Sequence, residues 1–379
     1  MRRTVIIVPG LLSEPESESY LRQKLPAFSL MAELATLSKV AVTPPTTTPE
    51  AMLLGLRASA IHLAQGPLMV SALGFDPPER STHFHLSLMS FDDGVASSPG
   101  MLPTPEEVDV ILKEAQRLNT KALTVLKGEE LNHAAVWEGL GDMYTTSADE
   151  VQGQFINGLF PQGDADILLR KLIDDSINLF SSLEFNIRRI DQGLPAFNLL
   201  WPWGQGTRSS VPNLALKRGE PAFVESGSMR LAGLTRLAGY RHVDRSLVGK
   251  GLRTKLRDIA GRALTRQLTI TYLDVPINLR MKNMREELDW FVKQLGTELL
   301  QPLLDDHLKS PSRVTLSAPG GFDSVSSSEM PWSPVGLSMS VETGVPSHNV
   351  YPFDERALEE RSVSERDLWS LIESAILMR

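Results

Sequence analysis

The run Thr4-Val5-Ile6-Ile7-Val8 lies close to the start of the chain and is followed at once by Pro9-Gly10. It is short, uninterrupted and rich in β-branched residues, which is typical of a strand buried on both faces of a parallel sheet. We expect further strands of this type at 122–126, 196–200, 268–273 and 314–317. In Thr82–Ser90 apolar and polar residues alternate instead, which indicates a half-exposed strand in an antiparallel or edge position.

Helical patterns alternate with these strands. Thr104-Pro105-Glu106-Glu107 combines a capping box with a proline at the first helical position, and it begins a helix that ends near Asn119. Amphipathic patterns predict further helices over 165–192, over 284–300 and from Ser364 onward. Strands that alternate with helices indicate an α/β fold with a mostly parallel sheet. Residues 65–162 contain the alternating strand, so we expect them to form a smaller α+β domain inserted into a core of residues 1–64 and 163–379.

The composition excludes several classes of protein. Hydrophobic residues make up 42% of the 379 residues and charged residues 22%, close to the average of globular proteins. The absence of cysteine excludes disulfides, iron–sulfur clusters and thiolate zinc sites. A formal net charge of -8 argues against a nucleic-acid partner, and no apolar run reaches the ~18 residues of a membrane helix. We therefore expect a cytoplasmic protein that binds neither nucleic acid nor membrane.

The segment from Arg230 to Arg266 is strongly basic, with ten lysines and arginines against two acids, Asp244 and Asp258. One interpretation is a surface for an anion or an acidic partner. The other, which we favour, is a solvated helix face whose cations pair with acids elsewhere. The histidines of the alternating strand, His83 and His85, leave a similar choice between a metal site and a solvated strand face, and we favour the solvated face.

The motif Trp201-Pro202-Trp203-Gly204-Gln205-Gly206 follows the predicted strand at 196–200 and is itself followed by Arg208. Glycines after a strand let the backbone approach a ligand closely, and ligands in α/β proteins bind beyond the carboxyl ends of strands. The motif therefore predicts a ligand site at Trp203, Gly204, Gln205, Gly206 and Arg208. A rigid turn with packed tryptophans is the alternative.

The stretch from Gly193 to Leu214 resembles the archaeal-type cofactor-independent phosphoglycerate mutases of the alkaline phosphatase superfamily. Gln65-Gly66-Pro67-Leu68 and Leu123–Gly128 resemble other segments of that family in the same order. The resemblance implies an alkaline-phosphatase-like α/β core with an inserted lid. It also implies transfer of a phosphate on glycerate through a phosphorylated serine, with two divalent metal ions, and it allows a homo-oligomer.

The motifs that bind metal in this family have no counterpart in the sequence. The family has Asp-Gly where this chain has Pro9-Gly10, and its Gly-His and Gly-Asp-His motifs are missing from the matching stretches 272–278 and 318–322. The nucleophilic serine falls on Thr46. We therefore expect no cofactor and a non-catalytic relative in which Lys127 and Arg208 hold a phosphorylated small molecule, or which binds a protein partner.

An active phosphoglycerate mutase or phosphatase with a relocated metal site is the alternative. Such a site would bind manganese, magnesium or zinc through Asp274, Asp323, Glu329 and His348. The loss of ligands at several separate places favours the non-catalytic relative, because a single alignment error would not produce it.

Overall fold

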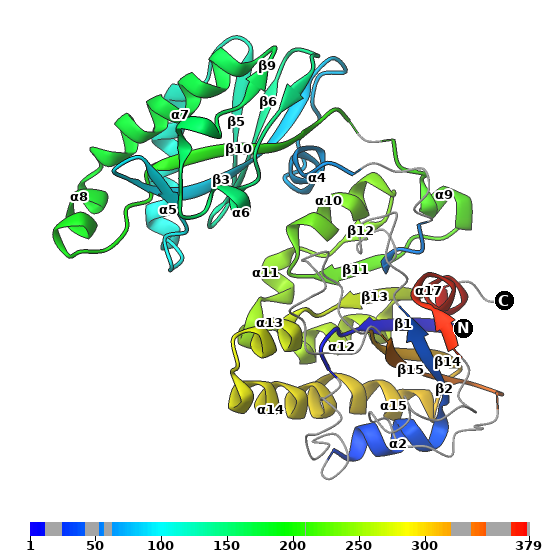
Figure 1. Cartoon of the computed structure of the whole chain (residues 1–379). Helices are drawn as coiled ribbons and strands as arrows, with labels where there is room; N and C mark the ends of the chain where they lie inside the picture. The colour runs from blue at the N-terminus through cyan, green and yellow to red at the C-terminus, as the bar shows by residue number, and fades with distance from the viewer. Residues whose placement is uncertain are drawn as a thin grey trace. The chain divides into compact units, whose positions relative to one another are not determined.

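The computed structural model describes residues 1–11, 25–41, 53–56, 63–208, 210–319, 335–345 and 365–376. The chain forms two compact units (Figure 1). The first unit comprises Met1–Ile61, Pro212–Ser228 and Ala238–Arg379, and the second comprises His62–Val211 and Met229–Leu237. The predicted insertion of 65–162 falls within the second unit, which continues to Val211 because β10 (Leu199–Gly206) pairs with β3 (Thr82–Asp92).

The first unit is built on an eight-stranded sheet with the strand order β12-β11-β13-β1-β14-β15-β2-β16. Its strands are β1 (Arg2–Ile7), β2 (Thr36–Ala41), β11 (Phe223–Ser226), β12 (Arg241–His242), β13 (Leu268–Tyr272), β14 (Ser312–Ala318), β15 (Val335–Glu342) and β16 (Glu365–Asp367). β1 runs parallel to β13 and β14, with Val5 beside Ile270 and Thr315. Only the β15 pairings are antiparallel among the described strands of this sheet. The predicted α/β class with a mostly parallel sheet is confirmed.

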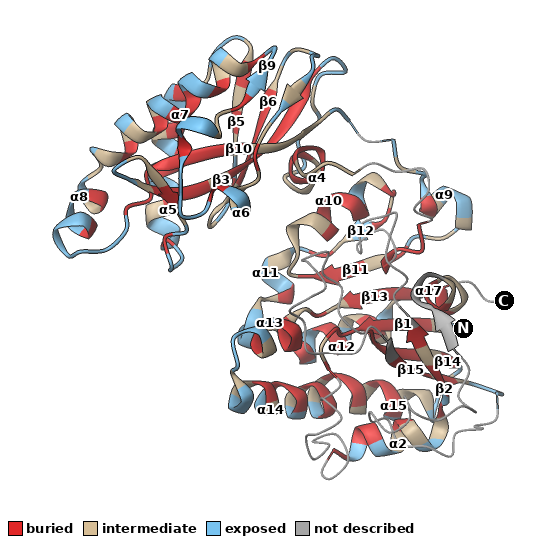
Figure 2. Cartoon of the chain, in the orientation of Figure 1, coloured by how far each residue is buried: buried red, intermediate tan, exposed pale blue. Residues whose placement is uncertain are grey.

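Helices of the first unit cover this sheet and complete its core. They are α2 (Pro26–Leu34), α9 (Leu214–Arg218), α11 (Arg245–Val248), α12 (Leu256–Thr265), α13 (Val275–Met281), α14 (Arg285–Gln294), α15 (Gln301–His307) and α17 (Leu368–Ile376), with a 3-10 turn at Gly251–Arg253. Apolar side chains of α2, α12, α14 and α15 pack on Ile6, Leu316 and Met339. Figure 2 shows the buried residues gathered on β1, β13 and the inward side of α14. The helix predicted over 284–300 begins as α14 and continues through a π-helical turn, Leu295–Leu300, into α15.

The second unit contains an antiparallel sheet in which β3 is the central strand. Its strands are β3, β4 (Val95–Ser97), β5 (Leu123–Glu129), β6 (Asn132–Trp137), β8 (Gln154–Phe155) and β10, beside a two-stranded pair of β7 (Met143–Tyr144) and β9 (Gln162–Gly163). The prediction that 122–126 and 196–200 are strands of the parallel type was wrong, because these segments form β5 and β10 of this sheet. A strand covered on both faces has the same apolar pattern in either kind of sheet.

Helices lie on both faces of the antiparallel sheet. They are α4 (Gln65–Ala72), α5 (Pro105–Ala115), α6 (Ala148–Val151), α7 (Asp166–Ser181), α8 (Glu184–Asp191) and α10 (Met229–Leu237), with 3-10 turns at Gln116–Leu118 and Ile156–Gly158. The capping box of α5 is confirmed, since Thr104 and Glu107 exchange both capping hydrogen bonds. The single helix predicted over 165–192 is two helices, α7 and α8. None of the helices in the described ranges is long and apolar enough to cross a membrane.

The half-exposed or edge position predicted for 82–90 was wrong, although the strand is antiparallel as expected. Phe84, Leu86 and Leu88 pack against α5 and α7 on one face. On the other face α4 covers the strand, and a Cβ added to its Gly66 would lie 2.2 Å from the carbonyl oxygen of His83. His83 and His85 are therefore buried and do not form a solvated strand face.

Candidate functional site

The carboxyl ends of the parallel strands lie at one edge of the first unit's sheet, where sites of α/β proteins occur. Pro9-Gly10 follows β1 there, and Asp274 follows β13. Gly10 has a φ of +73°, and a Cβ at this position would lie 2.7 Å from the Cα of Ile277. The main chain of this turn therefore packs directly on α13, and the guanidinium of Arg280 donates to the Gly10 carbonyl.

Asp274 carries the carboxyl group that follows β13, and the charges of two cations, Lys250 and Arg245, act on it. Removal from water raises the pKa of this carboxyl, whereas the side chain of Asn278 and the charges of Lys250 and Arg245 act in the opposite direction. Arg245 is the first residue of α11, and its Nε donates at 2.9 Å to the carbonyl of Gly227, which follows β11. The charge of Arg245 also acts on the carboxyl of Asp244, so two side-chain cations here act on two carboxylates.

The described residues at this edge do not fit the two metal ions that the resemblance implies. Pro9 has no ligand atom in its side chain, and the carboxyl of Asp274 interacts with an amide and two cations. Hard divalent cations require clustered carboxylates or imidazoles. Within the described ranges no group of three or more histidine, aspartate and glutamate side chains is placed to hold a metal ion. Thr46, Asp323, Glu329 and His348 lie outside the described residues.

The tryptophan–glycine motif lies in β10 of the second unit, and its polar groups bond within that unit. Nε1 of buried Trp201 donates to the carbonyl of Thr146 at 2.9 Å. Trp203 donates to the hydroxyl of Ser87 at 2.8 Å and packs against the imidazole of His85, with ring centroids 4.7 Å apart and the rings tilted by 37°. The Gln205 amide donates to the carbonyl of Met143 at 2.7 Å.

The two glycines of this motif, Gly204 and Gly206, are needed for close packing within the second unit. A Cβ on Gly204, which has a φ of +63°, would lie 2.5 Å from the Cβ of Gln65. A Cβ on Gly206 would lie 2.6 Å from the Cβ of Ala64. These contacts agree with the interpretation of a rigid, packed turn, and a ligand role for Trp203, Gly204, Gln205 and Gly206 stays a prediction.

Lys127, which was predicted to hold a phosphate, lies on β5. Its ammonium group forms an ion pair with Asp109 of α5, and both side chains are more than half exposed, at 57% and 66%. It is not one of the residues that line the cavity beside Arg208. The structure therefore does not bring Lys127 and Arg208 to one cavity, and the role of Lys127 also stays a prediction.

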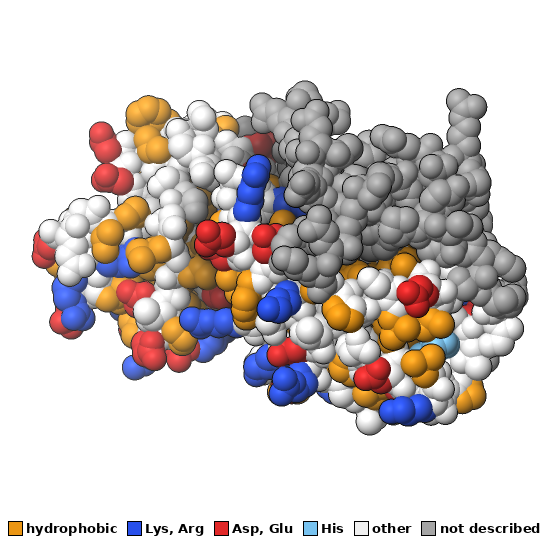
Figure 3. Space-filling view, turned by 90° about the horizontal axis from the view of Figure 1, so that it is seen from below, with side chains coloured by type: hydrophobic (Ala, Val, Ile, Leu, Met, Phe, Trp, Pro, Cys, Tyr) orange, Lys and Arg blue, Asp and Glu red, His pale blue; other side chains and the backbone are white. Residues whose placement is uncertain are grey.

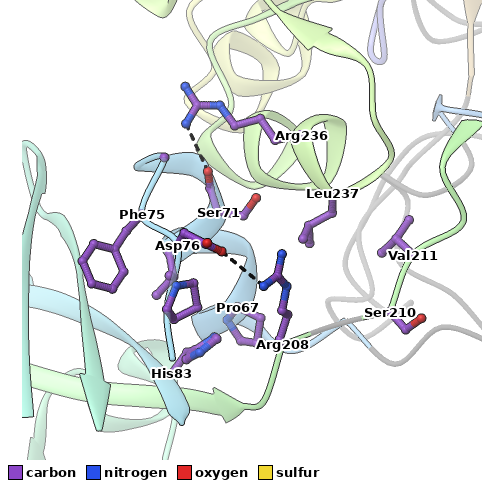
Figure 4. Close-up of a pocket in the computed structure, with 13 residues that line it drawn as sticks. Pro67, Ser71, Phe75, Asp76, His83, Arg208, Ser210, Val211, Arg236 and Leu237 are labelled. Carbon is purple, nitrogen blue, oxygen red and sulfur yellow. Dashed lines mark hydrogen bonds and ion pairs between the residues drawn. The ribbon is translucent and has the colours of Figure 1, made fainter. Parts of the chain in front are cut away.

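Arg208 lies at a cavity of about 400 Å³ within the second unit (Figure 4). The walls come from α4, the end of α10, β3 and the segment after β10. Nη1 of Arg208 is 3.1 Å from the carboxylate of Asp76, and Nη1 of Arg236 donates to the carbonyl of Ser71 at 3.2 Å. The sequence motif indicated Arg208, but only the packing of α10 on α4 brings Arg236 to the same cavity.

His83 also lines this cavity and is only 1% exposed. Its Nε2 lies 2.9 Å from the hydroxyl of Ser81. Burial, and to a smaller extent the charge of Arg208, lowers the pKa of His83 to about 4. The imidazole is therefore neutral at pH 7. The alternation of the strand did not reveal this environment, because it does not show that α4 covers the polar face.

Several cations of the basic segment 230–266 are paired with acids, as in the interpretation that we favoured. Arg262 and Arg266 bind the fully buried carboxylate of Glu225 at 2.6 and 2.9 Å. Arg257 lies 3.5 Å from Glu298. On the face seen in Figure 3, basic and acidic side chains are interspersed. Arg236 differs from these residues because it lines the cavity of the second unit.

Comparison with known proteins gives relatives of one kind. No family model matches the sequence. The 2,3-bisphosphoglycerate-independent phosphoglycerate mutase of Methanothrix thermoacetophila is 24% identical over 205 residues, which are 54% of this chain and 52% of that enzyme. The chain thus spans about half the length of this relative. The enzyme of the same name from Methanosarcina mazei is 21% identical over 320 residues, 82% of this chain and 81% of that enzyme.

Two solved structures share the fold along nearly the whole chain. The cofactor-independent phosphoglycerate mutase of Thermoplasma acidophilum has a TM-score of 0.63 at 18% identity and covers 100% of this chain and 99% of its own. The PH0037 protein of Pyrococcus horikoshii has a TM-score of 0.72 at 13% identity, with coverages of 98% and 96%. At these identities the likeness shows the fold alone.

Proposed function

This chain is a distant homologue of the archaeal-type 2,3-bisphosphoglycerate-independent phosphoglycerate mutases, and from that premise we propose that it is a non-catalytic relative that binds a phosphorylated small molecule. The activity in the names of the relatives is theirs. What this chain does depends on the side chains at the carboxyl edge of its parallel sheet.

Two side-chain cations beside Asp274, in place of metal-binding groups, are the observation that supports the proposal. Lys250 and Arg245 act on the carboxyl of Asp274, and Pro9 stands at the end of β1. A guanidinium offers paired N–H donors to phosphate oxygens, and an ammonium adds charge. Neither group activates a hydroxyl nucleophile or generates a bound hydroxide, as metal ions do. The edge therefore fits binding of a phosphate better than its transfer.

Titration calorimetry with 3-phosphoglycerate tests this function in the full chain. We expect binding that is unchanged by EDTA, because side-chain cations rather than metal ions hold the phosphate. The double variant Arg245→Gln/Lys250→Gln should bind about tenfold more weakly or worse, as expected for the loss of charged hydrogen bonds. Arg257→Gln is the matched control, because this 82% exposed guanidinium pairs with Glu298 and is not one of the charges that act on Asp274.

Two results would contradict the proposal. One is that the wild-type protein binds 3-phosphoglycerate only with manganese, magnesium or zinc present and loses it in EDTA. That result would favour the active enzyme with the relocated metal site predicted at Asp274, Asp323, Glu329 and His348. The other is that the protein binds no phosphorylated compound at millimolar concentration.

A further inference from the structure

We propose that a cavity of the first unit, between α17 and the strands β2, β14 and β15, is a binding site for an uncharged polyol of the size of a monosaccharide. Hydroxyl groups of these strands, one pair of opposite charges and a few apolar side chains line the cavity. It shares no residue with the phosphate site at the carboxyl edge of the same sheet. The inference therefore goes beyond the proposed function and does not depend on it.

The two faces of these three strands differ in chemistry. One face is apolar and belongs to the main core of the unit, with Leu37, Leu316 and Met339. The other face carries hydroxyl groups, and the register of the strands arranges them in two rows. Thr315, Ser340 and Thr36 are neighbours in one row, and Ser338 and Ser38 are neighbours in the next. A sheet face that a helix covers is normally apolar, so these hydroxyl groups indicate a polar occupant.

The charges that line the cavity cancel, which favours an uncharged ligand. Among the described residues that line it, Arg313 and Glu342 carry the charges, and their side chains form an ion pair. These side chains are only 11% and 25% exposed, so water screens the pair less than a surface pair. Nη1 of Arg313 also donates to the carbonyl of Ser374 in α17 at 2.8 Å. An anionic ligand would therefore have to compete with a carboxylate and a carbonyl for this guanidinium.

Three groups at the cavity retain capacity for hydrogen bonds to a ligand. Thr36 is exposed, and its hydroxyl has no hydrogen-bond partner among the described residues. The hydroxyl of half-buried Ser340 lies 3.0 Å from that of Thr315, and two hydroxyls that share one hydrogen bond keep one hydrogen and further lone pairs. Only Oε2 of Glu342 contacts Arg313, which leaves Oε1 as an acceptor. This mixture of donors and acceptors matches a ligand whose own hydroxyls both donate and accept.

The size and the apolar wall of the cavity suit one sugar ring. Its volume of about 280 Å³ lies just below the roughly 300–1,000 Å³ of sites for drug-sized ligands. Leu371 and Ala375 of α17 and Val345 after β15 line it beside the hydroxyl groups. A pyranose has hydroxyls around its edge and C–H groups on its two faces. Its edge would bond to Thr36 and Ser340 while one face packs on the apolar wall.

Glucose and tetrahydropyran-2-methanol test the site, because the second compound has the ring of glucose without its ring hydroxyls. Each is titrated into the full chain, and ¹H–¹⁵N NMR follows the backbone amides of Thr36 and Ser340. We expect glucose to shift these resonances saturably at millimolar concentration. Tetrahydropyran-2-methanol should bind at least about tenfold more weakly, because it cannot form the hydrogen bonds of the ring hydroxyls.

Removal of single hydroxyl groups shows whether glucose occupies this cavity. Thr36→Val and Ser340→Ala should each weaken glucose about fivefold, which is the effect of one hydrogen bond. Thr36 is exposed on a strand and valine favours strands, so Thr36→Val tests the site even if Ser340→Ala does not fold. Thr124→Val on β5 is the matched control, because this strand threonine lies in the second unit and does not line the cavity. It should leave the affinity for glucose unchanged.

The site would be overturned if glucose, myo-inositol and glycerol all fail to shift these amides saturably, or if both variants bind glucose as the wild-type protein does. Equal affinities for glucose and tetrahydropyran-2-methanol would contradict the role of the hydroxyl groups. Tighter binding of glucose 6-phosphate than of glucose at these amides would contradict an uncharged ligand. Because the amides of Thr36 and Ser340 report on this cavity, none of these results bears on phosphate binding at the carboxyl edge.

Discussion

Burial fixes the charge of three histidines in the second unit. The pKa values of His83 and His85 are lowered to about 4 and that of His133 to about 3, in each case mainly by removal from water. Nδ1 of His133 accepts from the backbone N–H of Gly128 at 3.1 Å, and Nε2 of His85 lies 3.1 Å from the Asn132 oxygen. All three side chains are therefore neutral at pH 7 and act as polar parts of the core.

These pKa values predict that the second unit loses stability as the pH falls. The pKa in the unfolded chain is close to 6.5, so between pH 6.5 and about 4 the unfolded state binds more protons than the folded state. Between pH 7 and pH 5, where most carboxylates stay ionised, His83 and His85 should each remove roughly 2 kcal/mol from the free energy of unfolding.

Urea unfolding followed by tryptophan fluorescence at several pH values between 7 and 5 measures this effect. In His85→Gln the free energy of unfolding lost between pH 7 and pH 5 should be smaller by roughly 2 kcal/mol. The reason is that the unfolded variant has one imidazole fewer to protonate. The same slope in the variant and the wild-type protein would contradict the pKa assigned to His85.

Only one of the charged residues that line the cavity of the second unit, Arg208, was predicted from the sequence as a binding residue. The tryptophan–glycine motif indicated Arg208, because Arg208 follows the motif directly. Arg236 and His83 were not identified as partners of Arg208, because tertiary packing brings them there from 28 residues downstream in sequence and from a separate strand. Spacing along one strand also gives no information about a helix that covers it, which is why the burial of His83 was missed.

Close packing of two helices, α4 and α10, positions the walls of the cavity. A Cβ added to Gly233 of α10 would lie 1.9 Å from the carbonyl oxygen of Leu68 in α4. Ser71 of α4 in turn donates its hydroxyl to the carbonyl of Gly233 at 3.0 Å. The separation of the two helices thus depends on the absence of a side chain at residue 233.

We expect Gly233→Ala to destabilise the second unit by about 2 kcal/mol or more, because backbone atoms cannot move aside as a flexible side chain does. Gly261→Ala in α12 is the matched control. This exposed helical glycine has no atom within 4 Å of an added Cβ, so alanine should stabilise its helix by about 0.5–1 kcal/mol. Thermal unfolding of both variants measures the two effects. Equal melting temperatures would contradict this account of the α4–α10 contact.

Some sequence patterns identify both an element and the sheet to which it belongs, whereas others identify only the element. β1, β13 and β14 were assigned correctly, since short β-branched runs are typical of buried parallel strands. β5 and β10 were assigned to the wrong sheet, because a short apolar run does not show whether its neighbouring strands are parallel or antiparallel. The start of α5 was predicted correctly because a capping box is a local feature.

The two units carry different sets of candidate binding residues. The first carries the parallel sheet, and its described carboxyl edge combines Asp274 with Arg245 and Lys250. The second carries a cavity with two arginines and a neutral histidine. Its extent to Val211 was not evident from the sequence, because the pairing of β10 with β3 joins segments more than 100 residues apart.

The central claim is that the scaffold of a phosphoglycerate mutase binds a phosphorylated molecule here without transferring its phosphate. Phosphorus NMR of 3-phosphoglycerate, incubated overnight with the purified protein and manganese, magnesium, zinc and cobalt, tests it most directly. We expect no new phosphorus resonance, because side-chain cations at the carboxyl edge do not activate a nucleophile. Formation of 2-phosphoglycerate or free phosphate that is lost on chelation of the metals would contradict the claim.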